Sequence, residues 1–201
     1  MTAPTVRVLI LGAAFLVGVA LCFGGIMLAT NRNVGAVTGG VFQSSIGGPF
    51  QLVDQDGRAT TERDLLGHPF LVFFGFTHCP DVCPTTLFEI SEVLNQLGPD
   101  AERVGALYIT VDPERDTPQA LKDYLSSFNP RLRGLTGDPA AIAAVLKNYR
   151  VYAKKVTLEG SDYTMDHTAI VYLMDRDGRF VAPFNLKRKP GELAAELRRY
   201  L

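Results

Sequence analysis

Uninterrupted apolar runs alternate with helix-like periodicity along residues 70–174. The runs at 70–76, 104–111 and 169–174 are rich in aromatic and β-branched residues and too short for helices, so they predict buried strands. Between them, apolar residues recur three and four positions apart, as on the buried face of a helix. The predicted inward faces are Leu87, Ile90, Leu94 and Leu97; Leu121, Tyr124, Leu125 and Phe128; and Ile142, Val145, Leu146 and Tyr149.

Shorter elements complete the pattern. We expect short strands at 50–53 and 133–136, a helical turn at 61–66, an exposed hairpin over 150–163, and a strand at 179–182 paired with 169–174. Pro190 opens a last helix with Leu193, Leu197 and Leu201 inward. Helical crossovers join the first strands, which are therefore predicted to be parallel. The sequence thus predicts an α/β sandwich.

The N-terminal residues predict a membrane anchor. No charged residue occurs from 8 to 31, and as a helix this stretch would span about 35 Å, enough to cross a bilayer core. A cleaved signal peptide is the alternative, but its apolar region is normally shorter, about 7–15 residues. The short tail before the anchor is expected to stay inside, with the domain exported. We therefore expect a tail and anchor at 1–31, a linker at 32–48 and one domain at 49–201.

Composition narrows the function classes. The chain has 201 residues and a formal net charge of −1, which gives no support for nucleic-acid binding. Three cysteines are too few for a disulfide scaffold. Cys22 lies in the anchor, and the bulky Leu21 before it argues against a lipoprotein signal. Cys22 is interpreted as a lipid-facing or packed residue.

The other two cysteines are the main chemical signal. Cys79 and Cys83 follow the strand predicted at 70–76, and Pro84 is expected at the first position of the next helix. A helix N-terminus favours thiolates, and this edge of an open α/β sheet is where ligands bind. A structural disulfide or two inert core cysteines is the alternative interpretation.

The spacing of the pair suits a metal as well as redox exchange. Three residues separate the cysteines, whereas thioredoxin-type motifs have two. His167 precedes the strand at 169–174 and is the third candidate ligand, and Asp166 could add a fourth ligand or orient the imidazole. Two thiolates and one imidazole favour copper, especially Cu(I), whereas structural zinc usually has four protein ligands. We expect the side chain of His78 to point away from the cysteines, and His68 to be a loop residue.

Three blocks of the sequence resemble the SCO/SenC family. They are Gly-Phe-Thr-His-Cys-Pro-Asp-Val-Cys-Pro-Thr at 75–85, Val-Asp-Pro-Glu-Arg-Asp-Thr-Pro at 111–118, and Tyr-Thr-Met-Asp-His-Thr at 163–168. The resemblance implies a membrane-tethered, thioredoxin-like domain that faces the periplasm of a bacterial inner membrane or the mitochondrial intermembrane space. It implies copper, Cu(I) or Cu(II), bound by Cys79, Cys83 and His167. It also implies delivery to the binuclear copper site of cytochrome c oxidase subunit II.

Two functions from different classes fit these residues. As a copper chaperone, the domain would hold copper at an exposed three-ligand site, and the tether would raise its effective concentration near a membrane recipient. As a thiol–disulfide oxidoreductase, Cys79 and Cys83 would reduce cysteines of the oxidase or of other exported targets. His167 discriminates between the two, because copper binding requires it and redox exchange does not. A peroxidase-like or redox-sensing module has no separate support. We favour the copper chaperone over an enzyme. We expect the chain to be anchored in a bacterial inner membrane with its domain in the periplasm.

Overall fold

The computed structural model describes residues 46–158, 160 and 162–201. The predicted anchor at 8–31 and most of the linker lie outside these residues. Among the residues described, no helix is both long and apolar enough to cross a membrane. The description below concerns the compact unit that begins at residue 43.

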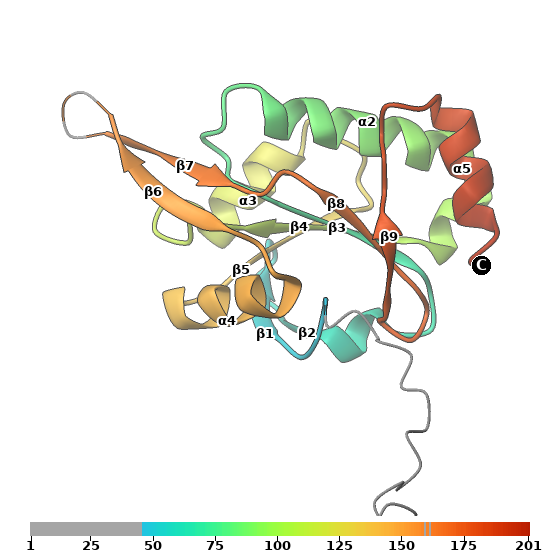
Figure 1. Ribbon diagram of the computed structural model, residues 1–201, viewed down its shortest axis with the longest axis horizontal. Coiled ribbons are helices and arrows are strands. Elements are labelled where there is room, and N and C mark those ends of the chain that lie inside the picture. The colour runs from blue at the N-terminus through green and yellow to red at the C-terminus, as the bar shows by residue number, and fades with distance from the viewer. Residues whose placement is uncertain (1–45, 159, 161) are drawn as a thin grey trace, which may run out of the picture. The chain divides into compact units, whose positions relative to one another are not determined.

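A seven-stranded sheet forms the centre of the domain (Figure 1). Its strands run in the order β2-β1-β5-β4-β3-β8-β9. Their bounds are β1 Gln51–Asp54, β2 Ala59–Thr61, β3 Phe70–Gly75, β4 Gly105–Thr110, β5 Leu132–Thr136, β8 Val171–Met174 and β9 Phe180–Pro183. All residues of β3 and β8 are buried, which agrees with their apolar runs.

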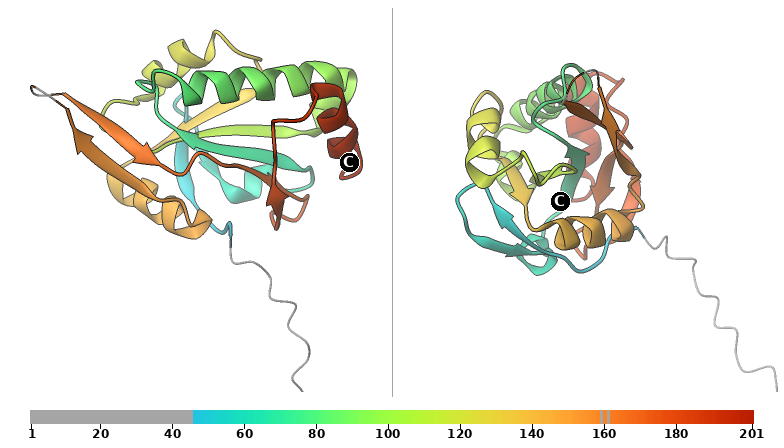
Figure 2. Two further views of the ribbon diagram at one scale, coloured as in Figure 1. Left: turned by 45° about the horizontal axis from the view of Figure 1, so that its top comes forward. Right: turned by 90° about the vertical axis from the view of Figure 1, so that its left-hand side faces the viewer.

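Four helices cover the two faces of this sheet. They are α2 Val82–Leu97, α3 Pro118–Leu125, α4 Pro139–Tyr149 and α5 Pro190–Arg198, with short 3₁₀ helices η1 Glu62–Leu65 and η2 Gly98–Arg103. Helices α2, α3 and α5 lie on one face and α4 on the other (Figures 1 and 2). The predicted inward positions of α2 are all buried. So are Leu121 and Leu125, Ile142, Val145 and Tyr149, and Leu193 and Leu197. The predicted α/β sandwich is confirmed.

Strand direction follows the connections, as predicted for the centre of the sheet. Strands β3, β4 and β5 are parallel and are joined by α2 and α3. The first strand, β1, is instead antiparallel to β5. It is linked onward through β2, with which it forms an antiparallel pair, so no helical crossover fixes its direction.

A separate two-stranded hairpin corrects the prediction for residues 150–170. Its strands are β6 Ala153–Thr157 and β7 Tyr163–His167, and it is not part of the central sheet. The hairpin was predicted to end at residue 163, before His167, but His167 is the last residue of β7. The following strand begins at Val171, not at 169. Residues 163–167 carry no apolar run because both faces of β7 are only partly covered.

The start of α2 also differs from the prediction. The helix begins at Val82, so Cys83 lies inside its first turn and Pro84 is its third residue, not its first. Proline fits there because the first four N–H groups of a helix have no intrahelical partner. The start of α3 is capped: the Thr117 side chain accepts a hydrogen bond from the Ala120 N–H, with Pro118 at the first position.

Gly134 in β5 is required by the packing of α3. A Cβ added there would lie 2.7 Å from Leu125 Cδ1 and 3.2 Å from Leu121 Cβ. We predict that Gly134→Ala destabilises the domain by about 1–3 kcal/mol, the usual cost of overpacking. Urea unfolding of the 43–201 unit measures the change. Gly191→Ala in α5 is the control, because nothing lies within 4 Å of its Cβ position. Equal stability of the two variants would contradict this account of the α3–β5 packing.

Candidate metal site

The sheet brings the cysteines and His167 together at one end of its central strands. Strand β3 leads into the cysteine turn and pairs antiparallel with β8, so that Phe73 lies opposite Val171. The end of β3 and the start of β8 are therefore neighbours, and His167 lies only four residues before Val171. Cys83 Sγ and His167 Nε2 are 3.8 Å apart although 84 residues separate them.

Backbone hydrogen bonds shape the cysteine turn. The Cys79 N–H donates to the Phe76 carbonyl at 3.2 Å, and the Cys83 N–H donates to Cys79 Sγ at 3.4 Å. This second N–H belongs to the first turn of α2, where donors and the helix dipole favour a negatively charged sulfur. The predicted link between the thiols and a helix N-terminus is thus present.

The two sulfurs have different surroundings. Both cysteines are free thiols; Cys79 is half-buried and Cys83 is fully buried. Burial raises the pKa of the Cys83 thiol to about 12, although the Phe76 backbone favours the thiolate. Gly75 permits this burial, since a Cβ there would lie 2.8 Å from Cys83 Sγ and 2.9 Å from the Tyr108 hydroxyl. In the absence of a cation, Cys83 is a protonated thiol at neutral pH.

The His167 ring is oriented for binding through Nε2. Its Nδ1 lies 3.2 Å from the Thr168 carbonyl, which can only accept, so Nδ1 is assigned the proton. Nε2 is then unprotonated and faces Cys83. Burial lowers the pKa of His167, which keeps the ring neutral, the form that binds metals. The rings of Phe73 and Phe76 lie at 61° and 88° to the imidazole plane, with centroids 6.5 and 5.8 Å away.

The distance between these donors fits a shared ion. Sulfur and nitrogen ligands bound at about 2.3 and 2.0 Å, and about 110–120° apart, are separated by roughly 3.5–3.7 Å. The observed 3.8 Å between Cys83 Sγ and His167 Nε2 is within about 0.3 Å of that separation. Within the described part of the chain, no three His, Cys, Asp or Glu side chains are already arranged to enclose an ion. Cys79 Sγ, which accepts the Cys83 N–H, would have to join this pair to complete the predicted set.

The other candidate residues lie apart from this pair. His78 is exposed, with Nδ1 3.1 Å from the Thr77 hydroxyl. Asp166 is exposed and pairs in register with Lys154. Since neighbouring residues of a strand point to opposite faces, Asp166 faces away from the His167 side of the hairpin. His68 precedes β3, so it lies at the opposite end of the sheet from the cysteines.

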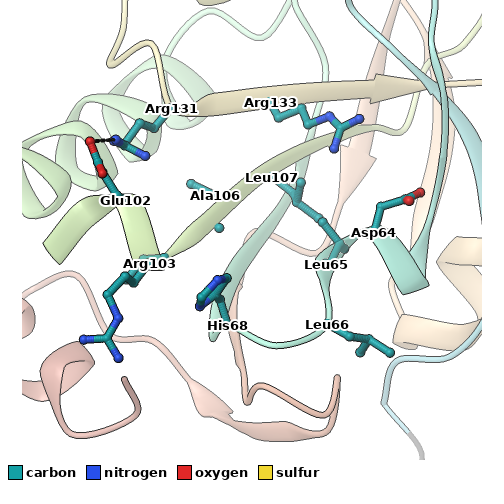
Figure 3. A pocket seen from close by; sticks show the side chains of 12 residues that line it. Asp64, Leu65, Leu66, His68, Glu102, Arg103, Ala106, Leu107, Arg131 and Arg133 are labelled. Atoms are coloured by element: carbon teal, nitrogen blue, oxygen red, sulfur yellow. Dashed lines mark ion pairs between the residues drawn. The ribbon is translucent and has the colours of Figure 1, made fainter.

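A pocket at that opposite end is lined by His68 but by neither Cys79 nor Cys83 (Figure 3). Its volume is about 210 Å³. Its arginines are already engaged: Arg131 pairs with Glu102 at 3.4 Å, Arg133 pairs with Asp54 at 3.0 Å, and Arg103 donates to the Leu201 oxygen. These contacts connect strands and helix ends, so the three arginines have a structural role.

Residues that no sequence pattern singled out support the site. Asp116 is buried and accepts hydrogen bonds from the Thr77 N–H and hydroxyl at 3.1 and 2.6 Å. Burial raises the pKa of Asp116, and its hydrogen bonds from Thr110 and Thr77 oppose this shift. Arg115, in the same loop as Asp116, donates a hydrogen bond to the carbonyl of Tyr163 in the hairpin. The available signal was their position within the second and third sequence blocks, at 111–118 and 163–168.

Known proteins resemble this chain over most of the described domain. The SCO1/SenC family model matches residues 39–201. The chain is 42% identical to the Arabidopsis thaliana protein SCO1 homolog 1, mitochondrial, over 75% of this chain and 46% of that protein. It is 41% identical to the human protein SCO1 homolog, mitochondrial, over 76% of this chain and 52% of that protein. The chain therefore spans about half the length of these curated relatives.

A solved structure agrees with the fold. The structure of Bradyrhizobium japonicum ScoI with copper bound is 68% identical, with a TM-score of 0.77, and covers 78% of this chain and 99% of that one. The α/β sandwich described above is thus a thioredoxin-like fold, as expected. On the match of the family model and of these relatives, the chain belongs to the SCO1/SenC family.

Proposed function

We propose that this domain carries copper at Cys79, Cys83 and His167. The observation that carries the proposal is the 3.8 Å approach of Cys83 Sγ to His167 Nε2, with the His167 Nδ1 proton directed to the Thr168 carbonyl. Two sulfurs and one imidazole nitrogen form a soft donor set that suits Cu(I). The copper-bound structure of the Bradyrhizobium relative supports the choice of metal.

The different exposure of the ligands suggests how copper is exchanged. Cys79 is half-buried, whereas Cys83 lies fully inside the fold and His167 behind partial cover. A recipient thiol or imidazole therefore reaches the ion from the Cys79 side, and the ligands are replaced one at a time. Binding replaces the Cys83 proton by the metal ion, so copper uptake releases protons.

We further propose the binuclear copper site of cytochrome c oxidase subunit II as the recipient. This follows from the family resemblance of the three sequence blocks. In this proposal residues 8–31 anchor the chain in a bacterial inner membrane and residues 49–201 face the periplasm. The anchor would keep donor and recipient at high effective concentration without requiring a strong protein–protein contact.

Thiol–disulfide exchange is the second candidate function, and the free, adjacent cysteines favour it. Cys79 would attack a partner disulfide as a thiolate, stabilised by the Cys83 N–H. Cys83 would then displace the partner thiol, so that the domain loses two electrons and two protons and the partner gains them. This chemistry makes no use of His167.

A histidine substitution separates the two functions. We predict that His167→Ala lowers Cu(I) affinity by more than the roughly 10–100-fold typical of losing a hydrogen-bond partner of a ligand. The cause is the loss of one of three donors, and competition with a chromophoric Cu(I) chelator measures it. Disulfide reduction by the same variant is expected to stay at the wild-type rate. His78→Ala, at an exposed position, is the control and should bind as wild type. Wild-type affinity of His167→Ala would rule out the ligand set.

The two thiols should also differ in alkylation. We predict that iodoacetamide modifies Cys79 before Cys83 in the reduced, metal-free domain at pH 8. Cys83 is fully buried, and its raised pKa keeps it protonated at that pH. Peptide mass spectrometry over time measures the order, and Cu(I) is expected to protect both thiols. Equal labelling of the two sites, with the fold intact, would contradict the described difference in burial.

A further inference from the structure

The strands of the hairpin that carries His167 are not hydrogen-bonded into the central sheet. Among the strands that the structure describes, β6 and β7 pair only with each other (Figure 1). Four of the five residues of β6 are exposed. Isolated two-stranded hairpins are at best marginally stable in water. The position of His167 relative to the cysteines therefore depends on contacts between the hairpin and the body of the domain.

The loop at residues 112–116, between β4 and α3, supplies such contacts. Arg115 Nε donates to Asp112 Oδ2 at 2.5 Å, and its Nη1 donates to the Tyr163 carbonyl at 3.0 Å. The guanidinium carbon lies 3.8 Å from the centroid of the Tyr163 ring. The Tyr163 hydroxyl in turn donates to Asp112 Oδ1 at 2.9 Å. Asp112 is buried and Arg115 only 18% exposed, so solvent screens these interactions little.

The same loop holds the cysteine turn. Asp116 accepts the N–H and the hydroxyl of Thr77, two residues before Cys79, and the hydroxyl of Thr110. Residues 112–116 thus bond to both segments that carry the proposed ligands. Nothing in the proposed copper site itself gives a role to this second sequence block.

We propose that Arg115 and Tyr163 form a clasp that sets the distance between His167 and the cysteines. This inference rests on the proposed copper site. Arg115 and Tyr163 are positioning residues: the contacts described for them join the hairpin to Asp112 and not to the ligands. Arginine is suited to the task because its planar fork bonds a carboxylate and a carbonyl while its face covers an aromatic ring.

A neighbouring contact provides an internal comparison. Lys155 of β6 pairs with Glu114 at 2.6 Å, and its Nζ lies 3.9 Å from the centroid of the Tyr163 ring. The Lys155 and Glu114 side chains are 43% and 62% exposed. Exposed pairs of this kind contribute little to stability. The clasp is therefore assigned to Arg115 and not to Lys155.

Hydrogen–deuterium exchange of the metal-free domain tests the clasp directly. We expect Tyr163→Phe and Arg115→Met to raise amide exchange at least about tenfold in β6 and β7, the effect of losing one hydrogen bond to a buried charged group. Exchange in β3 and β4 should not change. Lys155→Met and Arg131→Met are the controls, since Arg131 pairs with Glu102 at the other end of the sheet. Wild-type exchange of the hairpin in both clasp variants would overturn the proposal. So would an equal rise in β3 and β4, which would indicate global destabilisation.

Copper binding provides the second readout. We expect both clasp variants to lose about 10–100-fold in copper affinity, the range typical for residues that orient a ligand. The imidazole nitrogen coupling in the Cu(II) electron paramagnetic resonance spectrum should weaken with it. Wild-type affinity and coupling in both variants, while His167→Ala loses both, would overturn the clasp and leave the copper site intact. If His167→Ala keeps both, the ligand set fails, and the metal-free exchange data alone decide whether the clasp positions the hairpin.

Discussion

The approach of Cys83 to His167 is the constraint on which the rest of the structure depends. The two residues are 84 positions apart, and the antiparallel pairing of β3 with β8 brings their segments side by side, with 3.8 Å between sulfur and nitrogen. The central sheet provides a rigid edge, because β3 is buried throughout and bonded on both sides. The cysteine turn extends from this edge on one strand, and the histidine hairpin reaches it through the neighbouring strand.

Burial gives this pair its chemical character. A fully buried thiol with a raised pKa and a half-buried neutral imidazole are costly places for uncompensated charge. In the proposed site, a Cu(I) ion would offset the charge of one of the two thiolates that bind it. In that proposal the more exposed Cys79, whose sulfur accepts the Cys83 N–H, is the point of entry and exit for copper or electrons.

The sequence predicted the central sheet and its helices because their apolar patterns are strong. Buried strands β3, β4 and β8 carry apolar runs, and the buried faces of α2, α4 and α5 recur at helical spacing. The predicted end of the hairpin at residue 163 and the predicted start of α2 at Pro84 were wrong. Strand β7 carries no continuous apolar run, and Pro84 is tolerated at any of the first helical positions. His167 was found through its residue type and the family resemblance. Its approach to Cys83 and the contact between Asp116 and Thr77 both depend on the order of strands in the sheet. A linear pattern of residues does not encode that order.

The crystal structure of the 43–201 unit loaded with Cu(I) under reducing conditions tests the central claim most directly. The account predicts one copper ion, located by its anomalous signal, within about 2.0–2.3 Å of Cys79 Sγ, Cys83 Sγ and His167 Nε2. Copper bound by the two sulfurs alone, with the His167 ring turned away from it, would contradict the claim.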